Sequence, residues 1–295
     1  MSSSFKIKST RFLIFLFLFI FAQINKNHAT TLNKMNTNNM ATGKYADVNG
    51  LKMYYEIHGE GKSLVLIHGG GSTIETTFGK ILPLFAKHFK VIAVELQAHG
   101  HTSDRNVPET FEQDADDVAA LLKQLNISKA FIFGFSNGGS TTLQIAIRHP
   151  EIAEKIVVVS GAYLRDGFIP GFFGMMQHAS LENMPQALQH AFLKINNDTA
   201  ALQNMHDKDA ARMVAFKDWS EADIQSIKVP ALIMNADKDV VTNEHALKMS
   251  KLIPNAQLII LPGVHGAFLG EVCTAVPGSK LPEMTVGMVA EFLDK

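Results

Sequence analysis

The segment Gly134-Phe135-Ser136-Asn137-Gly138 is the strongest chemical motif of the sequence. An apolar segment typical of a buried strand precedes it, and a segment with helical spacing follows it. A tight strand-to-helix turn strains the backbone of its central serine and projects the hydroxyl outward, and glycines are needed where side chains would collide with neighbouring backbone. The motif therefore predicts Ser136 as a nucleophile.

The base for this serine is predicted to be His265. A serine hydroxyl becomes nucleophilic when a histidine accepts its proton and an acidic residue orients that histidine. In this type of motif the acid and then the histidine follow the serine along the chain. Among the 12 histidines, only His265 follows the last apolar strand segment. His245 falls early in a helical segment, and we expect it to be solvated.

Two aspartates, Asp237 and Asp239, compete for the role of the acid. Both directly follow the apolar segment 230–235. Asp239 is favoured because its longer reach past the strand end matches the usual position of the acid in this motif. Asp237 would then cap the loop. Substitution of each aspartate would decide between them.

A glycine-rich loop, Gly69-Gly70-Gly71, follows the apolar segment 64–67 and His68. Backbone N–H groups in such a loop can point at a developing oxyanion, and the missing side chains let a substrate approach. We predict an oxyanion hole made by the N–H groups of Gly70 and Asn137, with Gly71 as the next candidate in the loop. His68 is expected to brace the loop rather than to act as a base.

Strand and helix segments that alternate along the chain must position these residues. Apolar segments without alternation predict strands buried on both faces, and such an order indicates βαβ units with a mostly parallel sheet. The predicted strands are 51–58, 63–68, 90–95, 129–133, 155–160, 230–235 and 257–261. The predicted helices are 110–125, 141–148, 243–252 and 282–293.

Residues 165–228 interrupt this alternation and predict an inserted helical cap over the sheet. The segment contains no convincing strand and is rich in Phe and Met. Its apolar side chains are expected mostly to pack the cap onto the body, with a few lining a pocket. Its basic residues Arg165, Lys208 and Arg212 are expected to be solvated. The apolar candidates are Phe168, Phe172, Phe173, Met175, Met176, Met184, Met213, Phe216 and Trp219.

Taken together, these motifs resemble the α/β-hydrolase superfamily, and within it the small serine esterase and enol-lactonase-like branch with a short helical cap. The turn from Glu95 to Thr102 is similar to a further motif of that family, with Glu95 in place of its usual Asp. The resemblance implies an eight-stranded, mostly parallel sheet flanked by helices, with the second strand antiparallel. It also implies Ser136 as nucleophile, Asp239 as acid and His265 as base.

This resemblance implies a serine hydrolase that cleaves carboxylic ester or lactone bonds of a small, apolar substrate through an acyl-enzyme intermediate. Serine in the turn, where some relatives of this fold carry aspartate, favours acyl chemistry. Two alternatives stay open: hydrolysis of C–C bonds in vinylogous diketones on the same three residues, and a non-catalytic ligand binder with this fold. We expect no cofactor and no metal, since His99 and His101 have no third ligand at suitable spacing.

The composition limits the remaining classes. The chain has 295 residues, 46% of them apolar, and 27 Lys+Arg against 28 Asp+Glu give a net charge of −1. This composition predicts a well-packed core and argues against a nucleic-acid binder. The single cysteine, Cys273, excludes an internal disulfide, and we expect it to be a buried spectator thiol. The oligomeric state stays open.

The N-terminal residues 1–29 predict a signal peptide, so we expect a secreted or periplasmic protein. Lys6, Lys8 and Arg11 precede an apolar segment, residues 12–22, and no acid occurs in this leader. The apolar segment is shorter than the ~20 residues that span a bilayer, so no stable membrane span is expected after cleavage. Residues 30–43 predict a polar linker, and residues 44–295 the hydrolase domain.

Overall fold

The computed structural model describes residues 43–295. The predicted signal peptide, residues 1–29, and residues 30–42 of the predicted linker lie outside the described residues. In the part of the chain that is described, no helix combines the length and apolar character that a membrane crossing requires.

Eight strands form one sheet with the spatial order β1-β2-β4-β3-β5-β6-β7-β8. β2 pairs antiparallel with β1 and with β4, and all other neighbouring strands are parallel. The predicted α/β fold class, with its mostly parallel eight-stranded sheet, is confirmed. The strands are β1 (Lys44–Val48), β2 (Leu51–His58), β3 (Ser63–Ile67), β4 (Lys90–Val94), β5 (Ala130–Phe135), β6 (Ala153–Val159), β7 (Ala231–Lys238) and β8 (Ala256–Val264).

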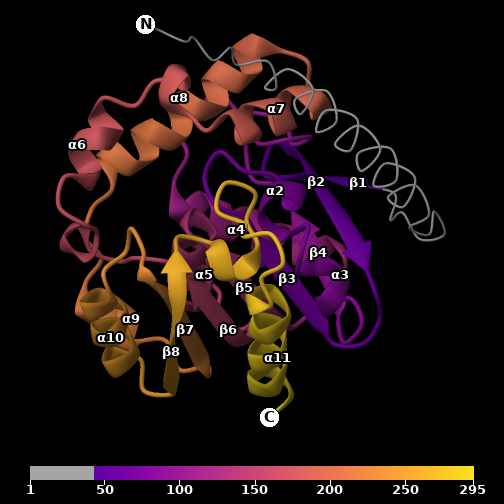
Figure 1. The fold of residues 1–295 in the computed structure, drawn as a ribbon. Helices are drawn as coiled ribbons and strands as arrows, with labels where there is room; N and C mark the ends of the chain where they lie inside the picture. The colour runs from indigo at the N-terminus through magenta and orange to yellow at the C-terminus, as the bar shows by residue number, and fades with distance from the viewer. Residues whose placement is uncertain (1–42) are drawn as a thin grey trace, which may run out of the picture. The chain divides into compact units, whose positions relative to one another are not determined.

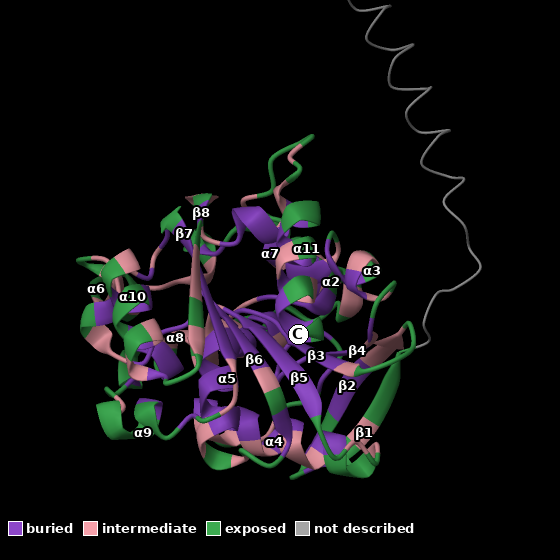
Figure 2. Cartoon of the chain, turned by 90° about the horizontal axis from the view of Figure 1, so that it is seen from below, coloured by how far each residue is buried: buried purple, intermediate pink, exposed green. Residues whose placement is uncertain are grey.

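Seven of these strands match the predicted segments closely, and β1 was not predicted. β1 lies at an edge of the sheet and exposes most of its residues, so its sequence lacks the apolar run that marks the buried strands. Figure 2 shows this difference, with the central strands buried and β1 largely exposed.

Helices cover both faces of the sheet and create two apolar cores. On β3, Val65 and Ile67 belong to one core, and Leu64 and Leu66 belong to the other, because successive side chains of a strand point to opposite faces. The first core is closed by α4 (Phe111–Gln124), α5 (Asn137–Arg148), α9 (Glu221–Gln225) and α10 (Asn243–Leu252), and the second by α2 (Ile74–Phe78), α3 (Leu82–Phe85) and α11 (Leu281–Asp294).

Between β6 and α9 the chain forms a set of helices that we call the cap; α9 itself packs on the body, although it falls within the predicted cap segment 165–228. The longest is α8 (Thr199–Ala215), which contacts both α6 and α7. Figure 1 shows α6, α7 and α8 grouped at the end of the sheet toward which the arrow of β8 points. The other parts of the cap are η2 (Arg165–Gly167), α6 (Phe172–Gln177), η3 (Leu181–Asn183) and α7 (Gln186–Ile195). The cap therefore lies over the carboxyl ends of the parallel strands, where the candidate residues are found.

Candidate active site

Ser136 lies in a sharp turn between β5 and α5. Its backbone has φ 55° and ψ −118°, a conformation that costs energy for a residue with a side chain. A Cβ atom on Gly134 would lie 1.9 Å from the carbonyl oxygen of Gly138, and one on Gly138 would lie 2.2 Å from that of Ile67. Only glycines fit at these two positions, so they let β5 and α5 approach closely enough to project the Ser136 hydroxyl.

The structure brings Ser136, His265 and Asp239 into one hydrogen-bonded row. His265 lies just after β8, and its Nε2 is 3.0 Å from Ser136 Oγ. Its Nδ1 is 2.6 Å from Asp239 Oδ1. With Asp239 accepting from Nδ1–H, Nε2 is left free to accept the serine proton. The ring of Phe135 packs against the imidazole, with ring centroids 4.6 Å apart.

Asp239 is buried and held by several donors. Its Oδ2 accepts from the Ser160 hydroxyl at 2.7 Å and from the backbone N–H of Ala236 at 3.1 Å. Burial alone would raise the pKa of Asp239, but the hydrogen bonds from His265 and Ser160 hold that pKa below its ordinary value. Asp237, the competing candidate, is exposed and accepts the backbone N–H of Gly263 at 2.6 Å.

The glycine loop after β3 lies beside the serine. Gly70, Gly71, Ser136 and Asn137 line one cavity. The Gly71 N–H donates to Asp209 at 2.5 Å, so it is already engaged. The backbone N–H groups of Gly70 and Asn137 donate to no acceptor within residues 43–295, which leaves both available for a substrate oxygen.

His68 supports this glycine loop through hydrogen bonds of both its ring nitrogens. Its Nδ1 lies 2.7 Å from the carbonyl oxygen of Gly69, and its Nε2 accepts the backbone N–H of Leu96 at 3.0 Å. The ring is therefore neutral with the proton on Nδ1, and burial lowers the pKa of His68 to about 3. It is fully occupied by these bonds and cannot serve as the base.

The cap carries a buried ionic cluster that sequence reasoning missed. Arg212, expected to be solvated, lies with its side chain buried and its Nη1 2.8 Å from Asp114 Oδ2. It also pairs with Asp209 and lies 3.7 Å from Glu109. Burial raises the pKa of Asp114 to about 6 and that of Glu109 to about 7. The prediction for Arg212 was wrong because two buried carboxylates distant in sequence, Asp114 and Glu109, compensate its charge together with Asp209 on the same helix.

Arg165 and Lys208 are also engaged with the protein, contrary to expectation. Arg165 donates to the carbonyl of Phe216 at 2.8 Å and lies over the ring of Phe173, 3.6 Å from its centroid. Lys208 pairs with Asp104 at 2.7 Å. Both cations therefore help to fix the cap rather than extend into solvent.

His99 completes the cluster and carries a positive charge. Its Nδ1 lies 2.7 Å from the carbonyl oxygen of Gln97, which can only accept, so Nδ1 bears a proton. Its Nε2 lies 3.0 Å from the Asp209 carboxylate and 3.1 Å from the backbone N of Gly71. Burial alone would lower the pKa of His99, but Asp209 raises it to about 9. No local signal in the sequence predicts this contact of His99 with Asp209.

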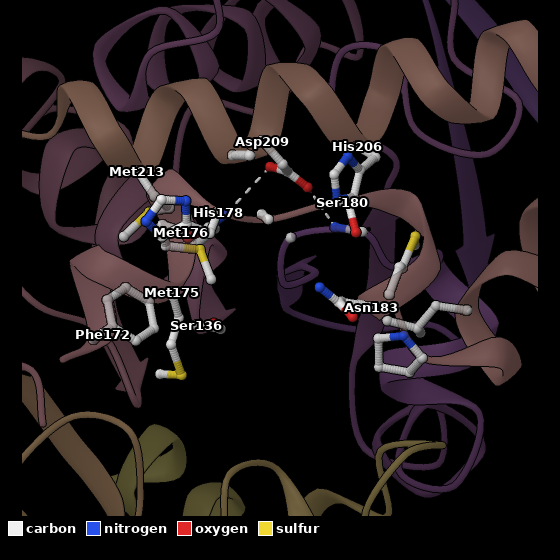
Figure 3. Close-up of a pocket in the computed structure, with 18 of the residues that line it drawn as sticks. Ser136, Phe172, Met175, Met176, His178, Ser180, Asn183, His206, Asp209 and Met213 are labelled. Carbon is white, nitrogen blue, oxygen red and sulfur yellow. Dashed lines mark hydrogen bonds between the residues drawn. The ribbon is translucent and has the colours of Figure 1, made fainter.

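A cavity of about 800 Å³ lies between the cap and Ser136. Figure 3 shows Phe172, Met175, Met176 and Met213 on one side, and Ser180, Asn183 and His206 on the other, with Asp209 above. Asp209 is the single residue with a permanent charge among the described residues that line the cavity, and none of them is Lys or Arg. Of the nine predicted candidates, Phe172, Met175, Met176, Met184 and Met213 line it.

Two further expectations were wrong. His245 is buried, not solvated, and its Nε2 accepts the backbone N–H of Tyr163 at 3.2 Å. Cys273 is exposed, not buried. Both depend on how loops pack near the ends of β6 and β8, which local sequence does not reveal. Within residues 43–295, no group of three or more His, Cys, Asp or Glu side chains is arranged to hold a metal ion.

Comparison with known proteins yields one matching family model, described as the alpha/beta hydrolase fold, over residues 62–272. A putative esterase/lipase of Haemophilus influenzae is 27% identical over 96% of this chain and 100% of its own length. A 2-hydroxy-6-oxo-6-(2'-aminophenyl)hexa-2,4-dienoic acid hydrolase of Metapseudomonas resinovorans is 25% identical over 74% of this chain and 82% of its own. The solved structure of an enol-lactonase from Burkholderia xenovorans LB400 superposes with a TM-score of 0.66 at 21% identity, covering 85% of this chain and 100% of the other.

Proposed function

This chain belongs to the alpha/beta hydrolase family and is a hydrolase, and from that premise we propose that it cleaves carboxylic ester or lactone bonds with Ser136 as nucleophile. The observation that carries the proposal is the hydrogen-bonded row Ser136–His265–Asp239, which ends beside two unengaged backbone N–H groups. A nucleophile, its base, the acid that orients the base and an anion site are the parts that acyl transfer needs.

In the proposed reaction, Ser136 Oγ attacks the carbonyl carbon while His265 Nε2 accepts the hydroxyl proton. The carbonyl oxygen becomes an oxyanion and accepts hydrogen bonds from the N–H groups of Gly70 and Asn137. When the tetrahedral intermediate collapses, the bond to the alkoxy oxygen breaks and His265 returns the proton to that oxygen. An acyl-enzyme remains. A lactone stays attached as a hydroxyacyl group, because its alcohol is part of the same molecule.

Water completes the cycle by the same steps. His265 accepts a proton from water as its oxygen attacks the acyl carbon, and then returns the proton to Ser136 Oγ as the acid leaves. Asp239 keeps its charge throughout and stabilises the imidazolium that forms twice in each turnover. Each oxyanion donor is expected to contribute about 3 kcal/mol to the barrier reduction.

The cavity has an apolar side and a polar side, which suits a small substrate with an apolar part. Phe172, Met175, Met176 and Met213 offer a flexible apolar surface to an acyl group or ring. The second candidate reaction is cleavage of a C–C bond. The Metapseudomonas relative is named as a hydrolase of a 2-hydroxy-6-oxo-dienoic acid, which is the kind of substrate that this reaction would need. None of the described lining residues is Lys or Arg, so a substrate carboxylate would find no cationic partner there, which favours a neutral ester or lactone.

The test is turnover by the full chain of p-nitrophenyl esters with increasing acyl length, of simple lactones, and of a 2-hydroxy-6-oxo-dienoic acid. We expect ester or lactone turnover, none of the dienoic acid, and labelling of Ser136 by a fluorophosphonate. Preferred turnover of the dienoic acid would favour the C–C reaction. An unlabelled, inactive but folded protein that still binds apolar ligands would identify a binder without catalysis.

The proposed setting is outside the cytoplasm. The basic start and short apolar segment of residues 1–29 support a cleaved signal peptide. N-terminal sequencing of protein recovered from culture medium or periplasm tests this proposal. Recovery in the cytoplasm with an intact leader would contradict it.

A further inference from the structure

The carboxylate of Asp209 joins the cap to both segments that carry the proposed oxyanion donors. Asp209 lies on α8, and its Oδ2 accepts the backbone N–H of Gly71 at 2.5 Å. Its Oδ1 accepts from Asn137 Nδ2 at 3.3 Å. In sequence, 138 residues separate Asp209 from Gly71, and 72 separate it from Asn137. Figure 3 shows Asp209 extending from the helix into the cavity, with dashed lines marking these bonds.

Three successive glycines make an anchor necessary. Gly69, Gly70 and Gly71 carry no side chains with which to pack, and glycine loses more conformational freedom on ordering than any other residue. Gly71 has φ 66°, in the left-handed region. A bond that holds the Gly71 N–H restricts the peptide that follows Gly70, and with it the direction of the Gly70 backbone.

Asp209 is ionised and fully occupied. Burial alone would raise the pKa of Asp209, but the Arg212 guanidinium and the His99 imidazolium hold that pKa well below its ordinary value. An ionised carboxylate has about four acceptor positions. Gly71 and His99 share Oδ2, while Arg212 and Asn137 share Oδ1. With those positions taken, Asp209 is suited to hold protein groups and not to act as a base.

We propose that Asp209 is a positioning residue of the oxyanion hole, a role that rests on the proposed ester or lactone hydrolysis. Its carboxylate orients the Gly70–Gly71 peptide and the start of α5 so that the N–H groups of Gly70 and Asn137 converge on the substrate oxygen. Because Asp209 belongs to the cap, the oxyanion hole is complete only while α8 lies over the cavity.

The test replaces Asp209 by Asn in the full chain and measures kcat, KM and the inhibition constant of a trifluoromethyl ketone. Such a ketone forms a hemiketal with Ser136 whose oxygen occupies the oxyanion hole. We expect kcat to fall by roughly 10- to 100-fold with KM changed by less than about threefold, and binding of the ketone to weaken by a similar factor to kcat. The matched control is Glu182→Gln, an exposed cap carboxylate that makes no hydrogen bond or ion pair to a described residue, and it should retain wild-type kinetics.

A second variant separates positioning from stability. Removing Asp209 alone leaves Arg212 with less compensation, which can unfold the cap. The variant Asp114→Asn weakens the same buried cluster, because Asp114 lies 2.8 Å from Arg212, but it leaves the contacts of Asp209 with Gly71 and Asn137 in place. We expect Asp114→Asn to lose stability in urea unfolding while kcat and ketone binding stay within about threefold of the wild type. A fall in kcat and in ketone binding as large as that of Asp209→Asn would show a purely structural role and overturn the proposal.

The outcomes distinguish this inference from the proposed function. If the wild type neither turns over esters and lactones nor labels at Ser136, the proposed function fails. If the wild type is active and Asp209→Asn retains its kcat and its affinity for the ketone, the proposed function stands and the role of Asp209 is wrong.

Discussion

The Ser160 hydroxyl donates to Oδ2 of Asp239 at 2.7 Å, while His265 occupies Oδ1 of the same carboxylate. Ser160 directly follows β6 with φ 52°, a strained conformation for a residue with a side chain. The neighbouring strand therefore fixes the rotation of Asp239 and, through it, the plane of His265. Nothing in the local sequence around Ser160 marked it as a partner of the triad.

Replacing Ser160 by Ala is expected to lower kcat by about tenfold, because Asp239 loses a hydrogen bond to its charged form. Since the pKa of Asp239 is held below its ordinary value, loss of that bond raises the pKa, and the acidic limb of the rate profile should move to higher pH. Rate profiles between about pH 3 and pH 6 measure this shift, since the ordinary pKa of Asp is near 3.9. An unmoved limb with normal kcat would mean that His265 alone orients the acid.

Separate Asn substitutions distinguish the two candidate acids. Asp239→Asn is expected to lower kcat by about 10⁴-fold, because an amide in this position favours the wrong tautomer of His265. Asp237→Asn should change kcat by less than about threefold, since Asp237 is exposed and holds only the Gly263 N–H. Steady-state kinetics on one ester decide the matter, and equal losses would contradict the assignment of Asp239.

Ser136→Ala and Ser136→Gly should both abolish acyl transfer, with kcat lower by about 10⁴- to 10⁶-fold. Their stabilities are expected to differ. At φ 55° a Cβ atom is strained, so the Gly variant should be more stable than the Ala variant by about 1 kcal/mol. Urea unfolding of both variants provides the comparison. A less stable Gly variant would show that the strain is not stored at Ser136.

Gly70→Ala tests the oxyanion loop against a matched glycine in the same cavity. A Cβ on Gly70 would lie 2.5 Å from Asn137 Nδ2 and 3.0 Å from Asp209 Oδ2, whereas one on Gly174 meets nothing within 4 Å. We expect Gly70→Ala to lower kcat by about 100-fold by displacing one oxyanion donor. Gly174→Ala, within α6, should leave kcat within about twofold and raise stability slightly. Equal kcat values for the two variants would argue against Gly70 as a donor.

The charge on His99 predicts how stability depends on pH. Its folded pKa is raised to about 9, so its contribution is complete below the unfolded value near 6.5 and disappears as the pH rises through 9. Between pH 7.5 and pH 9 the free energy of unfolding should fall by on the order of 1.4 kcal/mol per pH unit from this group. Glu109 and Asp114 lose most of their protons below this window, since their pKa values are about 7 and about 6.

His99→Gln isolates that contribution, because glutamine can still donate to Asp209 but does not titrate. Urea unfolding of the wild type and the variant at pH 7.5 and pH 9 measures how the free energy of unfolding of each protein changes with pH. Between these two pH values the free energy of unfolding should fall less in the variant than in the wild type. The same decrease in both would mean that His99 is neutral in the folded protein.

Local sequence patterns predicted most of the strands of the sheet. The apolar segments that became β3, β4, β5 and β7 are buried on both faces, so their composition alone marks them. β1 was not predicted because its residues are mostly exposed, and it becomes a strand through its pairing with β2. For the site, each candidate lies where an apolar segment ends, and the carboxyl ends of parallel strands meet at one edge of a sheet.

The ionic cluster around Asp209 could not be predicted in this way. Arg212 was expected to be solvated, and no motif of the sequence marks Asp209, which lies three residues before it on α8. In the structure Arg212 contacts Asp114, while Asp209 contacts His99 and Gly71 of the glycine loop. Those partners come from three separate segments, and only the docking of the cap brings them together.

The sequence by itself determined the type of fold, the strained turn at Ser136 and the order of serine, acid and histidine, because these depend on composition and on glycines at fixed local positions. Only the tertiary structure decided which aspartate meets His265, which glycine N–H is already engaged and what surrounds Arg212. These questions depend on distances between segments up to 138 residues apart, and long-range packing sets such distances.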